Sequence, residues 1–396
     1  MFKRTIFVVL MLIIFSGCWH LNDKTIVQSP EIDYYINVAS CIDLKSEILI
    51  SEISSEVFYI PLETSINSLI RHILKVICTE HFIFVADENG LYQFTFDGKF
   101  VQQIGNLGRG PGEHSTIMNF IVDDKANIII VQGQSSTVQY DLEGNYVKNL
   151  KRLPGLKFEF LNHDAIVFYK PNHTESPKNL IITSLNLIPI KEFINRNPRP
   201  KTNPSFLHAP LYLFNEHLYF KENFNDTVFC LQDSILAPYI LINEKELRLD
   251  KCFELKTTGD YSDLIMQLDR VEDKLLTHNI LECEKYVFIS YIQGMNPRSQ
   301  RYVNFIFDKQ DKNTFCLKNG EFFNDVDGGM NFYPTLRFDD NTLAMQIDAL
   351  KLKRYVNSEG FRATSVLHPE KKKELEDLAN SLSESDNPVL MVVRMK

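Results

Sequence analysis

The sequence predicts an all-β protein, a six-bladed β-propeller, from three observations. One stretch of short apolar segments repeats at an offset of 46 residues, further groups of such segments follow it, and a single strand-like segment stands at each end of the body. A period in the forties that consists of antiparallel strands is typical of propeller blades. We therefore expect a ring of small antiparallel sheets around a central axis.

The repeat covers two consecutive stretches of the chain. Residues 82–101 align with residues 128–147, so that Gly98 corresponds to Gly144. Each copy reads as a strand, a polar turn, a strand, an acidic residue followed by Gly, and another strand. Gly accepts the positive φ that tight hairpin turns require. Each copy is therefore expected to form most of one blade.

Four further blades follow with looser spacing. Runs rich in β-branched and aromatic residues, bounded by turn residues, predict their strands. The six blades are expected at about 69–105, 117–150, 158–194, 218–242, 286–317 and around 342–347. Residues 56–62 and 389–395 are expected to join the last blade, because closure of the ring leaves only short protected edges.

Two helical insertions interrupt the β pattern. The first, over residues 262–276, has apolar residues at i, i+4, i+7 and i+11, which is one face of a helix. The second begins at Pro369, a residue that is tolerated in a first helical turn. It places Leu375, Leu378 and Leu382 on one face.

The first 17 residues read as a signal peptide. Lys3 and Arg4 precede an apolar run over residues 6–15. This run is too short to cross a bilayer, which needs about 20 helical residues. Ser16-Gly17-Cys18 then resembles the lipobox of bacterial lipoproteins, which implies cleavage before Cys18 and a lipid (palmitate) anchor on it. The alternative is an ordinary secretory signal in which the cysteine is incidental.

Three segments follow from this interpretation. Residues 1–17 are a lipoprotein signal peptide, residues 18–45 an acylated tether, and residues 46–396 the propeller. The expected location is the cell envelope, at the outer membrane on its periplasmic or surface face.

Composition excludes some classes of function. The chain of 396 residues is 44% hydrophobic and 23% charged, enough for a large core, and its net charge of −9 argues against nucleic acid as a partner. No CxxC pair occurs among the seven cysteines. We interpret the six beyond Cys18 as free core thiols, although an oxidising compartment permits a disulfide pair.

The strongest candidate binding loop spans residues 105–114. The favoured interpretation is that its glycines and Pro111 shape the crossover between two blades. In the functional alternative, Arg109, Glu113 and His114 project into the mouth of the central channel, where the guanidinium of Arg109 would bind a carboxylate or phosphate.

Metal and nucleophile motifs are weak. The chain has no HxH, HExxH or GxSxG motif. A cation site built from acids of separate blades stays open, and the acids to inspect are Asp87, Asp123, Asp124, Asp327 and Asp339. Most of them are expected to be turn residues that bond their own backbone. We expect no cofactor, with a divalent cation as the alternative.

Several motifs resemble a known family. They are Ile60-Pro61-Leu62-Glu63-Thr64, Asp97-Gly98-Lys99-Phe100, Gly108-Arg109-Gly110-Pro111-Gly112-Glu113, Asn225-Asp226-Thr227-Val228, Asp327-Gly328-Gly329 and Asn387-Pro388-Val389-Leu390. In this order they resemble the six-bladed β-propeller lipoproteins of Bacteroidota, which are distant relatives of NHL-repeat propellers. The resemblance implies an exported, lipid-anchored propeller and says little about activity.

Three hypotheses about function remain open. The leading one is a non-catalytic module that binds an envelope protein, or a glycan or peptide ligand. The alternative is a metal-assisted hydrolase or lyase with its site at the central channel, which requires three or more of the named acids to converge. The third is a structural subunit of an envelope complex, which would show an apolar patch.

Overall fold

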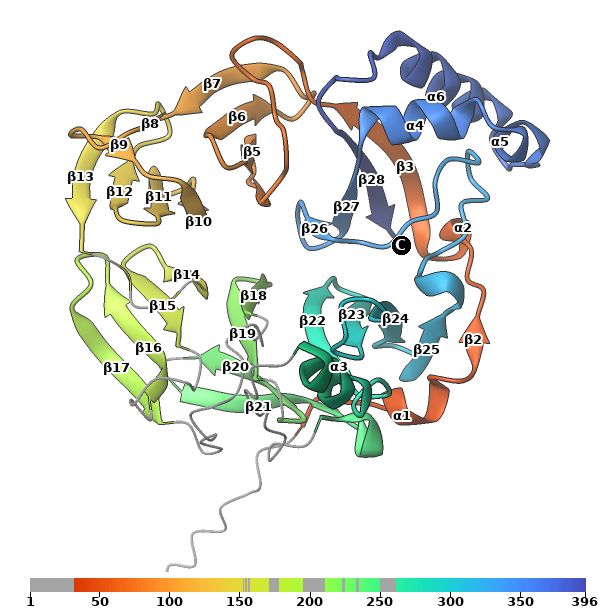
Figure 1. The fold of residues 1–396 in the computed structure, drawn as a ribbon, viewed down its shortest axis with the longest axis horizontal. Coiled ribbons are helices and arrows are strands. Elements are labelled where there is room, and N and C mark those ends of the chain that lie inside the picture. The colour runs from red at the N-terminus through yellow and green to blue at the C-terminus, as the bar shows by residue number, and fades with distance from the viewer. Residues whose placement is uncertain are drawn as a thin grey trace, which may run out of the picture. The chain divides into compact units, whose positions relative to one another are not determined.

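A computed structural model shows the propeller. It describes residues 32–396 except 152, 154, 156, 171–177, 195–210, 223–224, 233–234 and 250–260. The predicted signal peptide and Cys18 lie outside the described residues. Six small sheets of four or five strands form the ring seen in Figure 1, which confirms the predicted fold class.

Blades 1 to 3 are consecutive four-stranded antiparallel sheets. Blade 1 contains β4 (Lys75–Cys78), β5 (Phe82–Ala86), β6 (Leu91–Thr95) and β7 (Phe100–Ile104). Blade 2 contains β10 (Ile117–Asp123), β11 (Ile128–Gly133), β12 (Thr137–Tyr140) and β13 (Tyr146–Leu150). Blade 3 contains β14 (Lys157–Asn162), β15 (Ala165–Tyr169), β16 (Lys178–Ser184) and β17 (Pro189–Ile194). The sequence repeat therefore covers most of blades 1 and 2.

Blades 4 and 5 follow the same order, and blade 6 is composite. Blade 4 contains β18 (Leu211–Phe214), β19 (His217–Lys221), β20 (Thr227–Gln232) and β21 (Ile235–Ile242). Blade 5 contains β22 (Leu275–Glu282), β23 (Tyr286–Gln293), β24 (Arg301–Asp308) and β25 (Asn313–Leu317). Blade 6 contains β26 (Leu336–Arg337), β27 (Thr342–Ile347), β28 (Val389–Met395) and β3 (Ser54–Pro61).

The two ends of the propeller meet in blade 6. β28 pairs with β3 in antiparallel register, with Val389 opposite Pro61 and Val392 opposite Phe58. The predicted closure by an early and a late strand is therefore confirmed. The last strand lies between β27 and β3, so blade 6 holds together only when both ends of the propeller are in place.

Residues just before β3 also belong to the propeller. β1 (Tyr34–Ile36) adds to β21 of blade 4 and β2 (Lys45–Ser46) adds to β25 of blade 5, both in parallel. The short helices α1 (Val38–Cys41) and α2 (Ile50–Ile53) follow them in turn. The tether predicted over residues 18–45 therefore extends too far, since its last part adds edge strands. β1 has three residues and β2 has two, and segments this short show no strand periodicity in the sequence. The sequence therefore did not predict these two strands.

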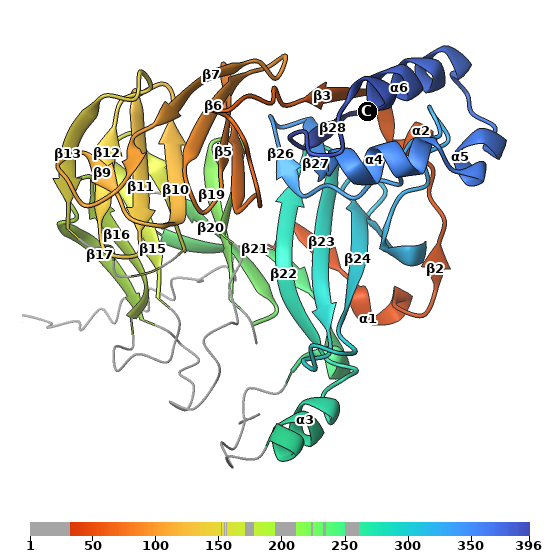
Figure 2. The same ribbon diagram turned by 45° about the horizontal axis from the view of Figure 1, so that its top comes forward.

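Both predicted helical insertions are present. α3 (Tyr261–Asp269) precedes blade 5, and Figure 2 shows it beyond the ends of β22, β23 and β24. It ends seven residues before the predicted end, and β22 begins at Leu275. α4 (Ala349–Val356), α5 (Glu359–Ala363) and α6 (Pro369–Ser381) lie between β27 and β28. The 3-10 turns are η1 (Lys245–Leu247) and η2 (Lys318–Gly320).

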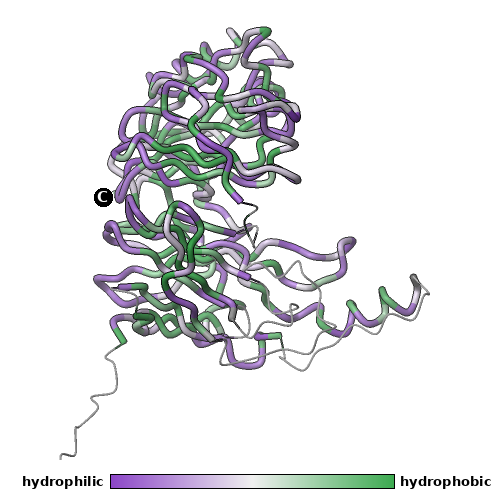
Figure 3. The backbone as a smooth tube through the Cα atoms, turned by 90° about the vertical axis from the view of Figure 1, so that its left-hand side faces the viewer, coloured by the Kyte–Doolittle hydropathy of each residue, from purple (hydrophilic) through white to green (hydrophobic). Residues whose placement is uncertain are grey.

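The core lies between neighbouring blades. Along β5, Ile83 and Val85 pack in a cluster with Val392 of blade 6, whereas Phe84 packs in a cluster with Ile129 of blade 2. Alternate side chains of one strand thus contact opposite neighbours, so both faces of a blade are buried. Figure 3 shows the resulting hydrophobic runs along the strands. Burial of each such side chain stabilises the fold by roughly 1.5–3 kcal/mol.

Strand direction gives the propeller two different faces. The first two strands of each blade join in tight turns at one end, which we call the turn face. The outer strand of each blade leads across the opposite end to the next inner strand, and we call this end the crossover face. Both helical insertions join strands at the crossover face. The longer connections, on which binding residues are commonly found, therefore gather on that face.

Candidate functional site at the propeller axis

The loop of residues 105–114 crosses from blade 1 to blade 2 on the crossover face. Within it, β8 (Asn106–Leu107) and β9 (Glu113–His114) pair in parallel. Arg109 is exposed and makes no hydrogen bond or ion pair with any residue that the structure describes. Glu113 turns into the loop, where its Oε2 accepts a 2.7 Å hydrogen bond from the backbone N–H of Gly110. Of the three candidates, only Arg109 is exposed.

His114 belongs to the core. Its side chain is 0% exposed, and its ring meets that of Tyr140 edge to face. Its Nδ1 lies 3.1 Å from the carbonyl oxygen of Ser115, and no described residue hydrogen-bonds its Nε2. Burial lowers the pKa of His114 because it disfavours the charged imidazolium. The loop does not bring Arg109, Glu113 and His114 together on one surface.

The five candidate acids accept hydrogen bonds from backbone N–H groups in turns. The pairs are Asp87 with Asn89 (2.7 Å), Asp123 with Ala126 (3.0 Å), Asp124 with Glu80 (3.0 Å), Asp327 with Gly329 (2.8 Å) and Asp339 with Asn341 (2.8 Å). Over the described part of the chain, no three His, Cys, Asp or Glu side chains form a group that could hold a metal ion. Four of these acids therefore stabilise their own turns through the nearby backbone, whereas Asp124 of blade 2 bonds the turn of blade 1.

Polar contacts between turns cover the axis at the turn face. Lys125 of blade 2 lies 3.3 Å from Glu216 of blade 4. The backbone N–H of Asn215 in blade 4 donates to Asp340 of blade 6 at 3.2 Å. Each contact skips one blade, and inner turns of such blades meet only across the axis. Lys75 and Lys157 are the first residues of the inner strands β4 and β14 and therefore lie at the opposite end, toward the crossover face.

Three charged side chains of inner strands gather at the axis. The Nζ of Lys75 on β4 donates to Asn119 Oδ1 (3.0 Å) and to the carbonyl oxygen of Phe120 (2.8 Å), both on β10. It also lies 4.0 Å from Glu159 Oε2 on β14. Lys157 stands two positions before Glu159 on the same strand. The strands of three consecutive blades thus place two lysines beside one carboxylate.

Burial shifts the pKa values of all three residues of this axial cluster, which are Lys75, Lys157 and Glu159. Burial lowers the pKa of Lys75 and of Lys157, and it raises the pKa of Glu159 although the lysines act in the opposite direction. Lys157 nevertheless has an exposed side chain. Lys157 begins β14, the innermost strand of blade 3, so its exposed side chain lies at the crossover end of the inner strands. Lys157 makes no hydrogen bond or ion pair with a described residue.

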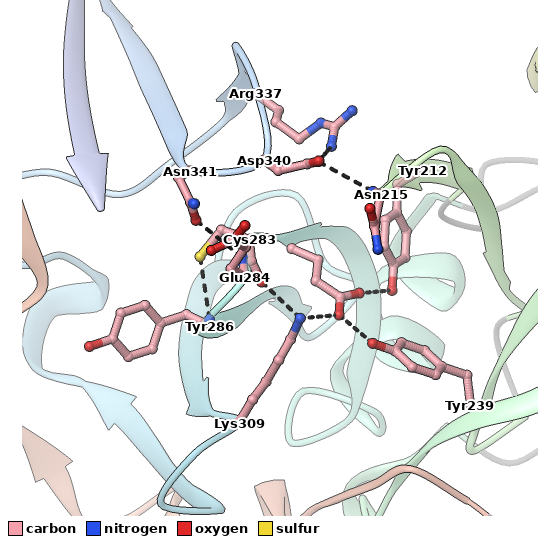
Figure 4. A network of polar contacts seen from close by, with 11 residues as sticks. Tyr212, Asn215, Tyr239, Cys283, Glu284, Tyr286, Lys309, Arg337, Asp340 and Asn341 are labelled. Atoms are coloured by element: carbon pink, nitrogen blue, oxygen red, sulfur yellow. Dashed lines mark hydrogen bonds and ion pairs between the residues drawn. The ribbon is translucent and has the colours of Figure 1, made fainter. Parts of the chain in front are cut away.

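A separate charged network is sealed between blades 4 and 5 (Figure 4). Glu282 is 0% exposed and accepts hydrogen bonds from Tyr212 (3.0 Å) and Tyr239 (2.6 Å) of blade 4. Its Oε1 also pairs with Lys309, which donates to the carbonyl oxygen of Cys283 at 2.8 Å. Burial and the charge of Glu282 raise the pKa of both tyrosines, so they stay neutral donors. Because Glu282 and Lys309 are paired with each other and hydrogen-bonded by buried groups, this network holds blades 4 and 5 together.

The thiols are not poised for nucleophilic chemistry. The prediction of free core cysteines holds for the described residues Cys41, Cys78, Cys230, Cys283 and Cys316. Cys252 lies outside the described residues. Burial raises the pKa of all five thiols, which disfavours the reactive thiolate.

Sequence reasoning missed the axial cluster. A lysine or glutamate within an apolar strand is the available signal, as in Lys157-Phe158-Glu159-Phe160. Such a pattern also fits a strand with one solvated face. Only the position of β14 as the innermost strand of its blade distinguishes the two.

Solved structures of other proteins share the fold. A presumed exported protein from Bacteroides fragilis is 18% identical, with a TM-score of 0.67 over 92% of this chain and 99% of that one. A member of the duf4221 family from Bacteroides vulgatus is 10% identical, with a TM-score of 0.50 over 87% of this chain and 97% of that one.

No functionally curated protein matches the chain. Among the described residues, no helix has the length and apolar character needed to span a membrane. The model of the family described as "Domain of unknown function (DUF4934)" matches residues 33–394. This match includes all six blades, and the chain therefore belongs to that family.

Proposed function

We propose that the protein is an exported, lipid-anchored propeller that binds a ligand at its axis without changing it chemically. The observation that supports this most directly is Lys157, an exposed lysine on the innermost strand of blade 3 that makes no hydrogen bond or ion pair with a described residue. Partial burial of a lysine costs free energy through desolvation unless a group of opposite charge pairs with it. A ligand from the crossover face would supply the missing partner.

The envelope location rests on the N-terminus. Lys3, Arg4 and the apolar run before Ser16-Gly17-Cys18 are typical of a lipoprotein signal, with the anchor on Cys18. The Bacteroides fragilis relative in fold is a presumed exported protein, and the sequence motifs resemble NHL-like lipoproteins. We place the propeller at the outer membrane, where an envelope protein, a glycan or a peptide could carry the bound group.

A binding role accounts for the structure better than the alternative of a metal-assisted hydrolase or lyase. That alternative requires converging acids, whereas the named acids bond turn backbones. Over the described part of the chain, no group of three acidic, histidine or cysteine side chains is placed to hold a metal ion. The axial cluster offers fixed charges that can hold a ligand.

Equilibrium dialysis against a small-molecule extract of the native envelope tests the proposal. The full chain in detergent is compared with a Lys157→Met variant, and retained compounds are identified by mass spectrometry over several hours. We expect at least one compound to be retained by the wild type, released by the variant and recovered with unchanged mass. Equal retention by both proteins, or conversion of the compound, would overturn the proposed function.

A further inference from the structure

The surroundings of Lys157 indicate what kind of ligand the axis binds. Lys75 and Lys157 carry two positive charges, against one negative charge on Glu159. Arg337 of blade 6, whose charge also acts on Glu159, is paired with Asp340 at the turn face. The cluster therefore keeps one positive charge in excess in a chain whose net charge is −9. An excess cation on the inner strands of the propeller favours an anionic ligand.

The two lysines have different roles. The ammonium of Lys75 donates hydrogen bonds to Asn119 and to the carbonyl oxygen of Phe120. Its third N–H donor is left for Glu159, whose carboxylate lies 4.0 Å away. Its ammonium is therefore fixed in place. Lys157 has all its donors free of described partners. A carboxylate or phosphate can form its direct bonds with Lys157 while Lys75 adds electrostatic attraction.

A second polar group beside the cluster lacks a partner. The side chain of Gln132 is 4% exposed, and its Oε1 accepts no hydrogen bond from a described residue. Its Nε2 donates to the carbonyl oxygen of Gly155 at 3.0 Å, and this acceptor fixes which end of the amide is which. A buried acceptor without a donor costs about 1–3 kcal/mol. A ligand hydroxyl, or a bound water, would remove this cost.

Gln132 neighbours residues that lie close to the two lysines. It lies opposite Asn119 in the β10–β11 register, and Asn119 accepts from Lys75. On its other side it bonds Gly155, two residues before Lys157. Gln132 thus lies one strand out from Asn119 in blade 2, and its amide bonds the segment that leads into Lys157 in blade 3.

We infer that the ligand is a small organic anion, with a carboxylate or phosphate bound by Lys157 and Lys75 and a neighbouring hydroxyl that donates to Gln132. This inference rests on the proposed function and adds the chemical class of the ligand. Glu159 orients Lys75 and disfavours a second negative charge close to the first. A neutral polyol lacks the charge, and a simple fatty acid lacks the donor.

Isothermal titration calorimetry with four matched probes tests the chemical class of the ligand. Glycerate and glycerol 3-phosphate carry both features, glycerol carries only hydroxyls, and propionate carries only the anion. All titrations use one ionic strength, because salt screens the attraction. We expect at least one hydroxylated anion to bind, propionate to bind more weakly and glycerol not to bind.

Variants locate the binding. Lys157→Met is expected to raise the dissociation constant roughly tenfold or more, since a charged hydrogen bond is lost. Lys157→Arg should retain part of the affinity, and Lys148→Met on the outer strand β13 should leave it unchanged. Gln132→Met should reduce the preference for glycerate over propionate. Circular dichroism and urea unfolding show that each variant is folded.

Each remaining outcome contradicts the inference in a distinct way. Binding that survives Lys157→Met places the anion elsewhere, and absence of binding by both hydroxylated anions removes the class. An unchanged preference in Gln132→Met means that water satisfies this amide. If dialysis retains a neutral compound that depends on Lys157, the proposed function stands and the anionic class is wrong.

Discussion

Removing the negative charge of Glu282 should destabilise the propeller severely. Glu282→Gln keeps the size of the side chain but leaves Lys309, which is 7% exposed, without its counter-ion. The ammonium also lies 4.1 Å from the ring centre of Phe214, a contact too weak to replace a carboxylate. Breaking a buried pair by removing one partner costs about 3–5 kcal/mol. A typical domain has about 5–15 kcal/mol of stability in total.

The double variant Glu282→Gln/Lys309→Met separates charge burial from packing. It removes both charges while a methionine keeps most of the lysine volume, so we expect it to lose less stability than the single variant by about 2 kcal/mol or more. The exposed pair of Glu47 and Lys318, 2.7 Å apart, gives the control. Glu47→Gln should cost at most about 1 kcal/mol.

Urea unfolding followed by far-UV circular dichroism measures these free energies. The slopes with urea must agree among the variants, since a changed slope would indicate a different unfolding reaction. A cost for Glu282→Gln as small as that for Glu47→Gln would refute the reasoning. A double variant less stable than the single one would also refute it, because the two charges would then not depend on one another.

Three further predictions use the same assay. Gly98→Ala should cost more than Gly144→Ala, because both residues have positive φ but a Cβ at Gly98 would also collide with the carbonyl oxygen of Pro61; equal costs would contradict this. His114 has a lowered pKa, so the unfolded chain binds a proton that the folded chain does not, and stability should fall as pH drops below about 6.5. The slope with pH should decrease in His114→Gln, and an unchanged slope would mean that other groups cause it. Deletion of Val389–Met395 should abolish cooperative unfolding, because β27 and β3 lose their shared partner; a retained sharp transition would show that blade 6 is dispensable.

The parts of the fold that repeat a local pattern were predictable. The turns at Gly98 and Gly144 need a residue that accepts positive φ, and the observed φ values of 82° and 79° agree with that requirement. Ring closure followed because a lone strand at each end needs a partner. The edge strands β1 and β2 were not predictable, because they are two or three residues long and gain their stability from parallel pairing with strands about 200 residues or more away.

The same distinction explains why the axial cluster was not found from the sequence. A turn acid such as Asp87 bonds the backbone two residues later, so its role can be read locally. Lys75 comes from the inner strand of blade 1, whereas Lys157 and Glu159 share the inner strand of blade 3, and each alone looks like a polar residue on a half-exposed strand. What makes them a site is the rotation from one blade to the next, which brings the inner strands together around one axis. Residue type therefore identifies the turns of this propeller, whereas only strand order within each blade identifies the side chains that a ligand can reach.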